Sequence, residues 1–213
     1  MDLSNFRENY TLIALKQSDL AADPIEQFER WFQEARDAAI LEPNAMSLAT
    51  ASSEGRPSSR TVLMKVFDGR GFVFFTNYHS DKAQELEANP QASLLFPWLK
   101  LQRQVHIDGS TERTSKEENE AYFATRPRES QISAWISKQS QPIASRAELE
   151  RAWKELELRF PENSTIPLPP HWGGYRICPA KIEFWQGRSG RLHDRFRYTK
   201  VANGGWTIER LCP

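Results

Sequence analysis

Residues 45–77 read AMSLATASSEGRPSSRTVLMKVFDGRGFVFFTN, and this stretch determines the fold class. It contains three short runs rich in β-forming residues, AMSLATAS, SRTVLMKVF and GFVFFTN. The polar, turn-forming segments SSEGRP and DGRG separate them, which is the pattern of consecutive antiparallel strands. We therefore predict a three-stranded antiparallel meander over these residues.

A helix is predicted directly upstream, over DPIEQFERWFQEARDAA. Asp23 is a good N-cap, Pro24 suits the first helical position, and Glu26 stands where a capping box needs it. The apolar residues of this segment recur with helical spacing and share one face. They are Ile25, Phe28, Trp31, Phe32 and Ala35.

Downstream, strands and helices continue to alternate. Ser80 caps a short helix, Pro97 marks an edge or bulge between two further strands, and capping boxes at 114–117 and 145–148 begin two more helices. The tail returns to strands in GGYRIC, AKIEFWQ, LHDRFRYTKV and GWTIERL. This order predicts an α+β, mainly β, fold built on an antiparallel barrel of about six to eight strands with surrounding helices.

Composition excludes several classes of protein. The 213 residues carry 28 basic and 28 acidic side chains, and this balance argues against a general nucleic-acid binder. No apolar run approaches the ~18 residues of a membrane span, and the start lacks a signal-peptide core, so we expect a cytoplasmic protein. The histidines and the two cysteines show no metal-ligand spacing, so no metal is predicted. Residues 1–20 are polar and predicted to be a mobile arm, and residues 21–213 a single domain.

Positive charge is nevertheless concentrated locally, in GRSGRLHDRFRY at 187–198. If this segment is a strand, Arg191, His193, Arg195 and Arg197 share one face. A solvated edge strand is the commoner explanation of such a row. Trp185 of the preceding IEFWQG instead favours a site for a flat anionic ligand.

Three weaker clusters also suit anions. Arg60 and Lys65 bracket an apolar strand in RTVLMK, and Lys82 lies in the first turn of a helix, where a bound phosphate would explain a cation. Tyr122 and Arg126 share a helix face, with Ser130 after the break at Pro127. Each cluster alone is equally well explained by a solvated surface.

Taken together, the motifs resemble one known family. They are RTVLMK, FFTN, SLLFPW, LQRQV, RPRESQISAW, SKQSQPI, WGGYR, IEFWQG and RLHDRF, in that order from about residue 23 to the C-terminus. The chain is in this respect similar to the pyridoxamine/pyridoxine 5′-phosphate oxidase family. The resemblance implies an FMN-binding split barrel and a homodimer with FMN at the subunit interface. It also implies oxidation of pyridoxamine 5′-phosphate or pyridoxine 5′-phosphate by O2 to pyridoxal 5′-phosphate, with H2O2, and NH3 from the amine. In this family a hydride passes from the substrate C4′ carbon to flavin N5.

The same resemblance implies the roles of individual residues. Those expected at FMN are Arg60, Thr61, Val62, Leu63, Met64, Lys65, Phe75, Thr76, Lys82, Gln104, Gln139, Ser140, Trp185 and Arg195. Those expected at the substrate are Lys65, Tyr122, Arg126, Ser130, Arg191, Leu192, His193 and, from the arm, Arg7 and Tyr10. Arg191 and His193 are the expected catalytic pair, acting on the pyridine ring. One departure is Asp81, which stands where the family often has an arginine at the FMN phosphate.

Other functions remain open at this stage. A split-barrel flavin reductase, or an oxidase of another substrate, would keep the FMN residues without needing the substrate residues. A flavin or pyridoxal-phosphate carrier would bind without turnover. Nucleic-acid binding is the weakest alternative, because the basic residues lie in distant segments.

Overall fold

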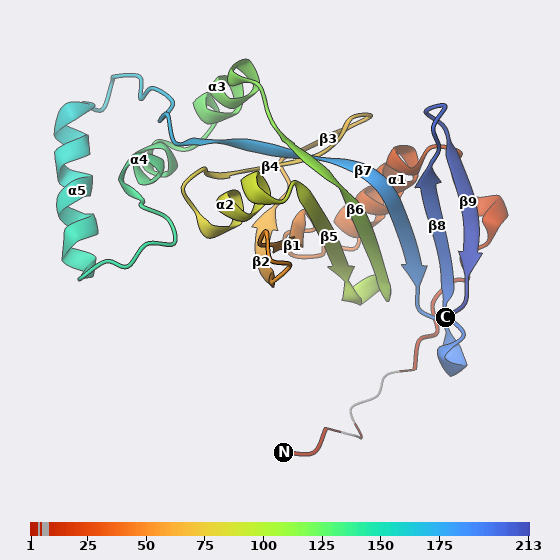
Figure 1. Cartoon of the computed structure of the whole chain (residues 1–213). Helices are drawn as coiled ribbons and strands as arrows, with labels where there is room; N and C mark the ends of the chain where they lie inside the picture. Colours follow the sequence, from red (N-terminus) through yellow and green to blue (C-terminus); the bar gives the residue numbers. More distant parts are fainter. Residues whose placement is uncertain (4, 6–8) are drawn as a thin grey trace.

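The computed structural model describes residues 1–3, 5 and 9–213. Over these residues a single nine-stranded antiparallel sheet curls into a half barrel, with α-helices around it (Figure 1). The strands are β1 (Ala45–Ala51), β2 (Pro57–Leu63), β3 (Val66–Asp68), β4 (Gly71–Asn77), β5 (Gln91–Trp98), β6 (Arg103–Arg113), β7 (Trp172–Gln186), β8 (Asp194–Lys200) and β9 (Trp206–Leu211). The α-helices are α1 (Pro24–Asp37), α2 (Asp81–Ala88), α3 (Lys116–Ala124), α4 (Arg128–Ile136) and α5 (Arg146–Arg159). The mainly β, antiparallel fold class predicted from the sequence is confirmed, although the described sheet has nine strands where about six to eight were expected.

The strand β7 organises the sheet. The strand order is β2-β1-β5-β6-β7-β4-β3, with β8 paired to β7 and β9 to β8. Along its 15 residues β7 pairs with β6, while β4 covers its first half and β8 its second half. The segments GGYRIC and AKIEFWQ, predicted as separate strands, are therefore one continuous strand, and the irregularity at Pro179 is only a register shift against β6.

The predicted three-stranded meander is wrong in one respect. β1 and β2 form a hairpin, but β2 ends at Leu63, and β3 and β4 form a second hairpin whose outer partner is β7. Met64 explains the break. Its N–H donates to Asn44 O at 2.9 Å and its carbonyl accepts from Asn44 Nδ2 at 2.9 Å. Lys65 N then donates to Val73 O at 2.8 Å, which directs the chain toward β4.

Helix α1 packs against the sheet and contributes Phe28, Trp31 and Ala35 to the main core. Asp23 Oδ1 accepts from Ile25 N at 2.7 Å, which confirms the predicted N-cap, whereas Glu26 pairs with Arg30 and forms no capping box. Phe28 is completely buried at the centre of an aromatic cluster. Its ring lies 5.1 Å from Phe67, 4.9 Å from Phe72 and 5.0 Å from Phe96, between centroids. Such edge-to-face packing stabilises the core beyond the buried area alone.

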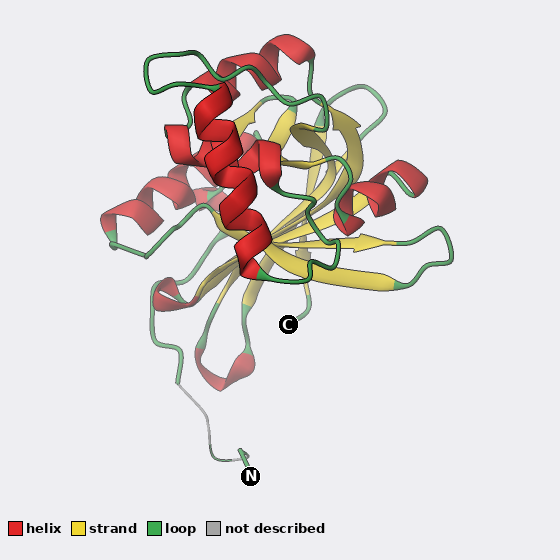
Figure 2. Cartoon of the chain, turned by 90° about the vertical axis from the view of Figure 1, so that its left-hand side faces the viewer, coloured by secondary structure: helices red, strands yellow, loops and turns green. Residues whose placement is uncertain are grey.

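Helices α3, α4 and α5 lie between β6 and β7 in the chain and gather at one end of the sheet (Figure 1). Figure 2 views the molecule from that end, with helices in front of the strands. They enclose a second, smaller cluster around Phe123, Ile132 and Trp172. The capping box of α3 is formed by Ser115 and Glu118, one residue later than predicted, because Thr114 is buried and donates to Asn119 Oδ1. The box predicted at Ser145 is absent, although Ser145 is the N-cap residue of α5.

The N-terminal segment is attached to the sheet from Tyr10 onward. Leu15 is buried in the main core, and its N–H donates to Asp194 Oδ2 at 3.1 Å. The N–H groups of Thr11 and Leu12 donate to Gln102 Oε1. Arg7, predicted at the substrate, lies outside the described residues. No helix of the described chain has the length and apolar character needed to cross a membrane.

Candidate active site

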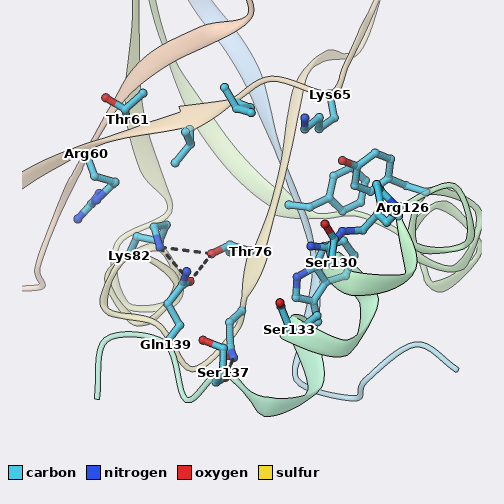
Figure 3. Close-up of a pocket in the computed structure, with 18 of the residues that line it drawn as sticks. Arg60, Thr61, Lys65, Thr76, Lys82, Arg126, Ser130, Ser133, Ser137 and Gln139 are labelled. Atoms are coloured by element: carbon cyan, nitrogen blue, oxygen red, sulfur yellow. Dashed lines mark hydrogen bonds between the residues drawn. The ribbon is translucent and has the colours of Figure 1, made fainter. Parts of the chain in front are cut away.

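A cavity of about 830 Å3 opens between β2, β4 and the helices α2–α4 (Figure 3). It collects most of the binding residues predicted from the sequence. These are Arg60, Thr61, Val62, Leu63, Lys65, Phe75, Thr76, Lys82, Tyr122, Arg126, Ser130, Gln139 and Ser140. Met64 does not line it, because its side chain is buried in the core. The volume lies in the range of ligand-binding clefts.

One end of the cavity is built around Lys82, in the first turn of α2. The Nζ atom of Lys82 lies 3.2 Å from Gln139 Oε1 and 3.4 Å from the hydroxyls of Thr76 and Ser80. Burial lowers the pKa of the Lys82 amine, and the nearby Arg60 charge lowers it further. Within the described residues Lys82 forms no ion pair, so an anion at this position would stabilise its charge.

Arg60 lies beside this end but already has an acidic partner. Its Nη2 is 3.1 Å from Glu85 Oε2 and 2.6 Å from Ser58 Oγ. Burial raises the pKa of Glu85, but hydrogen bonds from Ser58, Thr50 and Arg60 outweigh it, so the pKa lies below its usual value. Glu85 is therefore a carboxylate close to a site suited to anions.

The opposite end of the cavity is built around Arg126, in the turn between α3 and α4. Its guanidinium carbon lies 4.6 Å from the ring centre of Trp172. The Nη1 atom is buried and has no hydrogen-bond partner among the residues that the structure describes. Burial lowers the pKa of Arg126. Figure 3 shows Arg126 and Ser130 together, across the cavity from Arg60 and Lys82.

Tyr122 forms the wall beside Arg126. Its ring stacks on Phe75 with a centroid distance of 4.0 Å. Burial raises the pKa of Tyr122, and the charge of Arg126 opposes this only in part. The hydroxyl therefore remains a proton donor at neutral pH, available to an anion held by Arg126.

A second group of predicted residues lies at the other end of β7. Gln104, Trp185 and Arg195 are register partners across β6, β7 and β8, so they share one face of the sheet. Trp172 lines the cavity at the start of β7, and Trp185 lies near its end. At about 3.3 Å per residue, the two are about 40 Å apart along the strand. A small ligand in the cavity cannot reach this second group of the same chain.

The predicted row of four cations on one strand face is wrong. Arg191 lies in a 3-10 turn (Ser189–Arg191) and β8 begins only at Asp194, so His193 precedes the strand. Gly190, with φ 62°, permits this turn. Arg195 and Arg197 do share a face, and each pairs with a carboxylate of a neighbouring strand, Glu183 and Glu209 respectively. Leu192 is exposed in the connecting loop.

His193 is held in one tautomer. The backbone N–H of Arg188 donates to His193 Nδ1 at 3.1 Å. An N–H donor requires an unprotonated acceptor, so the proton of the neutral ring is on Nε2. Burial, followed by the charge of Arg191, lowers the pKa of His193 and favours this neutral form. The ring packs against Trp185 with a centroid distance of 4.6 Å.

Two family models match the chain. Residues 32–160 match the model described as pyridoxamine 5′-phosphate oxidase, and residues 172–213 match that of the pyridoxine 5′-phosphate oxidase C-terminal dimerisation region. The chain belongs to the pyridoxine/pyridoxamine 5′-phosphate oxidase family. It is thus a member of an oxidoreductase family, and its dimerisation region supports a homodimer.

Relatives of this family match along the whole chain. A pyridoxine/pyridoxamine 5′-phosphate oxidase of Rubrobacter xylanophilus is 57% identical, over 100% of this chain and 97% of its own. One of Streptomyces avermitilis is 54% identical, over 100% of this chain and 96% of its own.

Solved structures agree with the fold. The structure of PhzG from Burkholderia lata 383, in complex with tetrahydrophenazine-1-carboxylic acid, has a TM-score of 0.89 at 32% identity, covering 97% of this chain and 100% of its own. A pyridoxamine 5′-phosphate oxidase-related, FMN binding protein of Nostoc punctiforme has a TM-score of 0.74 at 16% identity, covering 91% and 100%, and shows the fold alone.

Some lining residues of this oxidase-family cavity were not predicted. Ser133 and Ser137 join Ser130 on its wall. The three-residue spacing of Ser130 and Ser133 places these two on one face of α4, whereas Ser137 follows the end of the helix. Trp172 belongs to the motif WGGYR, but the sequence does not identify it as a cavity residue. No sequence pattern identifies Glu85, because its ion pair with Arg60 forms only when α2 packs against β2. Among the described residues no cluster of His, Cys, Asp or Glu could hold a metal ion.

Proposed function

We propose that this protein is an FMN-dependent oxidase that converts pyridoxamine 5′-phosphate or pyridoxine 5′-phosphate into pyridoxal 5′-phosphate. O2 would accept the electrons and yield H2O2, and the amine substrate would release NH3. One observation carries the proposal: the two ends of a single cavity each present a half-buried cation, Lys82 and Arg126, that forms no ion pair with a carboxylate among the described residues. FMN and the substrate each bring one phosphate, close to dianionic at neutral pH. The names of relatives 54–57% identical to the chain support the same reaction.

The donors at the Lys82 end fit FMN. The ammonium of Lys82 and the hydroxyls of Thr76 and Ser140 are suited to a phosphate, with Arg60 beside them. In the described sheet β2 pairs only with β1, so the free edge of Thr61–Leu63 offers backbone N–H and C=O groups to the polar rim of a flavin ring. Bound FMN would supply the redox chemistry, accepting a hydride from the substrate C4′ carbon and passing the electrons to O2.

Asp81 bears on how tightly FMN is held. It is exposed at the start of α2, and its N–H donates to Ser140 Oγ at 3.2 Å. Its carboxylate cannot serve as a phosphate ligand. We expect Lys82 to be the principal charge at the FMN phosphate.

The Arg126 end would hold the phosphate of the substrate. Arg126 can donate through its free Nη1, and Tyr122 and Ser130 through their hydroxyls, with Lys65 at the cavity wall. Fixing the phosphate at one end orients the rest of the molecule toward the flavin. This positioning is the main contribution of these residues to the rate.

A second copy of the chain would complete the site. The second group of Gln104, Trp185 and Arg195 lies too far along β7 to reach its own cavity. The same holds for the neighbouring predicted residues Arg191, Leu192, His193 and, from the arm, Tyr10. In a homodimer one copy would place this group over the cavity of the other, with FMN at the interface. The match of residues 172–213 to a dimerisation region supports this arrangement. His193 would donate from Nε2, and with Arg191 would orient the pyridine ring and stabilise its developing charge.

An aerobic assay tests the proposal. We expect the purified protein to be yellow, to consume O2 with either phosphorylated substrate, and to produce equimolar H2O2 and aldehyde. An oxidase of a reduced phenazine acid, as the likeness to PhzG raises, would prefer a carboxylate without a phosphate. Binding of both ligands without peroxide would indicate a carrier. The predicted arm of residues 1–20 and the cytoplasmic location belong to this proposal.

A further inference from the structure

The described part of the N-terminal arm lies against the aromatic residues of the second group. The Tyr10 ring is 5.9 Å from Trp185 and 5.7 Å from His193, between centroids. The N–H groups of Thr11 and Leu12 donate to Gln102 Oε1 at 3.1 and 3.4 Å. The described part of the arm therefore packs on Trp185 and His193 of its own chain.

Arg188, which no motif assigned to a role, connects the arm to the turn that carries His193. Its Nη1 donates to the carbonyl of Leu12 at 3.1 Å, and its backbone N–H donates to His193 Nδ1 at 3.1 Å. Its Nε lies 3.6 Å from Asp194 Oδ2, and the same oxygen accepts from the N–H of Leu15. One residue thus contacts the arm with its side chain and the histidine with its backbone.

Gly187 gives the arm room to pack. A Cβ atom at this position would lie 2.7 Å from Cδ2 of Tyr10, far closer than carbon atoms approach in proteins. Its N–H also donates to the carbonyl of Gln102 at 2.7 Å, so the chain before Arg188 is fixed to the residue that holds Thr11 and Leu12. The arm, Gln102 and the 187–188 segment form one hydrogen-bonded unit.

We propose that Arg188 is a positioning residue that ties the arm at Leu12 to the turn of His193, so that Tyr10 is held against Trp185 and His193 before substrate binds. The kinetic part of this inference rests on the proposed oxidase function, whereas the docked arm does not. Without the guanidinium, the described part of the arm keeps the Gln102 hydrogen bonds, the ring contacts of Tyr10 and the Leu15 bond to Asp194, but loses the hydrogen bond at the Leu12 carbonyl. The arm is then less well ordered, and substrate binding must order it. The free-energy cost of ordering the arm then weakens substrate binding and does not slow the chemical step.

The first experiment measures amide hydrogen exchange of Thr11 and Leu12 in the FMN-loaded protein without substrate. The variants are Arg188→Ala and, as a matched control, Arg56→Ala, whose exposed ion pair with Glu54 lies in the β1–β2 turn. We expect exchange at both amides to become about three- to tenfold faster in Arg188→Ala, in keeping with the loss of one partly solvent-exposed hydrogen bond, and to stay unchanged in Arg56→Ala. Unchanged exchange in Arg188→Ala would overturn the proposal.

The second experiment is a double-mutant cycle with Tyr10→Ala. We expect Arg188→Ala to raise KM for pyridoxamine 5′-phosphate about three- to tenfold with kcat nearly unchanged. In the Tyr10→Ala background the same substitution should have little further effect, because Arg188 acts through the arm. An equal increase of KM in both backgrounds would contradict this role. If neither phosphorylated substrate is oxidised, the proposed function fails, and the exchange measurement still decides whether Arg188 holds the arm.

Discussion

The guanidinium of Arg126 rests on the face of Trp172, 4.6 Å from the ring centre, while its Nη1 is buried without a partner among the described residues. The stacking fixes the orientation of the guanidinium, and its unpaired N–H donor indicates a site for an anionic ligand. A buried donor that lacks a partner costs free energy, which a bound phosphate would recover. This relationship is the main support for our proposal that Arg126 binds the substrate phosphate.

We therefore expect Arg126→Ala to raise KM for pyridoxamine 5′-phosphate about 10- to 100-fold, since a hydrogen bond to a charged group is worth about 1.5–3 kcal/mol. KM for unphosphorylated pyridoxamine should barely change. Steady-state kinetics with both compounds measures this. As a control, Arg159→Ala removes an arginine that stacks on Trp135 and does not line the cavity. An equal rise in KM for both compounds would show that Arg126 does not bind the phosphate.

Glu85 is expected to weaken FMN binding, because its carboxylate pairs with Arg60 next to the Lys82 end of the cavity. Glu85→Gln keeps an acceptor for Ser58 and Arg60 but removes the negative charge. We expect the Kd of FMN to fall about three- to tenfold, the effect of removing one partly screened like charge. Titration of the apoprotein by flavin fluorescence measures it, with Glu54→Gln in the β1–β2 turn as the control. Weaker binding in Glu85→Gln would instead show that Glu85 holds Arg60 in place for the phosphate.

Activity should depend on pH through His193. Its folded-state pKa lies below the usual value of about 6.5, so the folded protein favours the neutral ring and the unfolded chain takes up the proton first. The contribution of neutral His193 to the free energy of unfolding is therefore complete above about pH 6.5, and it is lost as the pH falls through the folded-state pKa. Protonation also breaks the hydrogen bond from Arg188 N to Nδ1.

We expect kcat/KM to fall on the acid side with an apparent pKa below about 6.5. His193→Gln should lower the activity and remove this limb of the pH profile. A profile of unchanged shape in His193→Gln would show that the limb belongs to another group.

The sequence predicts the local features of this fold well and its long-range pairing poorly. The N-cap at Asp23 and the β runs of residues 45–77 depend on neighbouring residues, which is why they were recognisable. The break at Met64 depends on Asn44, twenty residues away, and the pairing of β4 depends on β7, about a hundred residues away. Neither partner is specified by local propensity.

The same distinction holds for the site. Lys82 and the residues of the compact motif RTVLMK, apart from the buried Met64, do meet in one cavity. The strand alternation predicted for RLHDRF is wrong for Arg191 and His193, because Gly190 allows a turn before the strand begins. The ion pair of Glu85 with Arg60 could not be predicted from the sequence, because it requires α2 to lie against β2. The separation of the second group from the cavity depends on β7 being one continuous strand, whereas Pro179 in the sequence indicates two separate strands.

A network beneath α3 should stabilise the substrate end of the cavity. Arg176, 2% exposed, donates to Asp68 and Glu118 at 2.7 and 2.9 Å. Glu118 also accepts from Ser115 N and from Arg70. We expect Glu118→Ala to lower the free energy of unfolding by about 2–4 kcal/mol, because it leaves a buried arginine with one fewer carboxylate.

Urea unfolding monitored by tryptophan fluorescence measures this loss. Glu120→Ala is the control on the same helix, since its contact with Lys116 is on the surface and should contribute less than about 0.5 kcal/mol. Backbone hydrogen bonding at Ser115, followed by hydrogen bonds from Arg70 and Arg176, holds the pKa of Glu118 below its usual value despite burial. The contribution of Glu118 to the free energy of unfolding should therefore be complete above about pH 4.5 and disappear as the pH falls through the folded-state pKa. Equal effects of the two substitutions would contradict the network.

The most direct test of the central claim is one aerobic assay of the purified protein with pyridoxamine 5′-phosphate. We expect flavin absorbance near about 450 nm, consumption of O2, and H2O2 and pyridoxal 5′-phosphate in equal amounts. A protein that remains colourless after incubation with FMN, or that binds FMN but forms no peroxide with either phosphorylated substrate, would contradict the account.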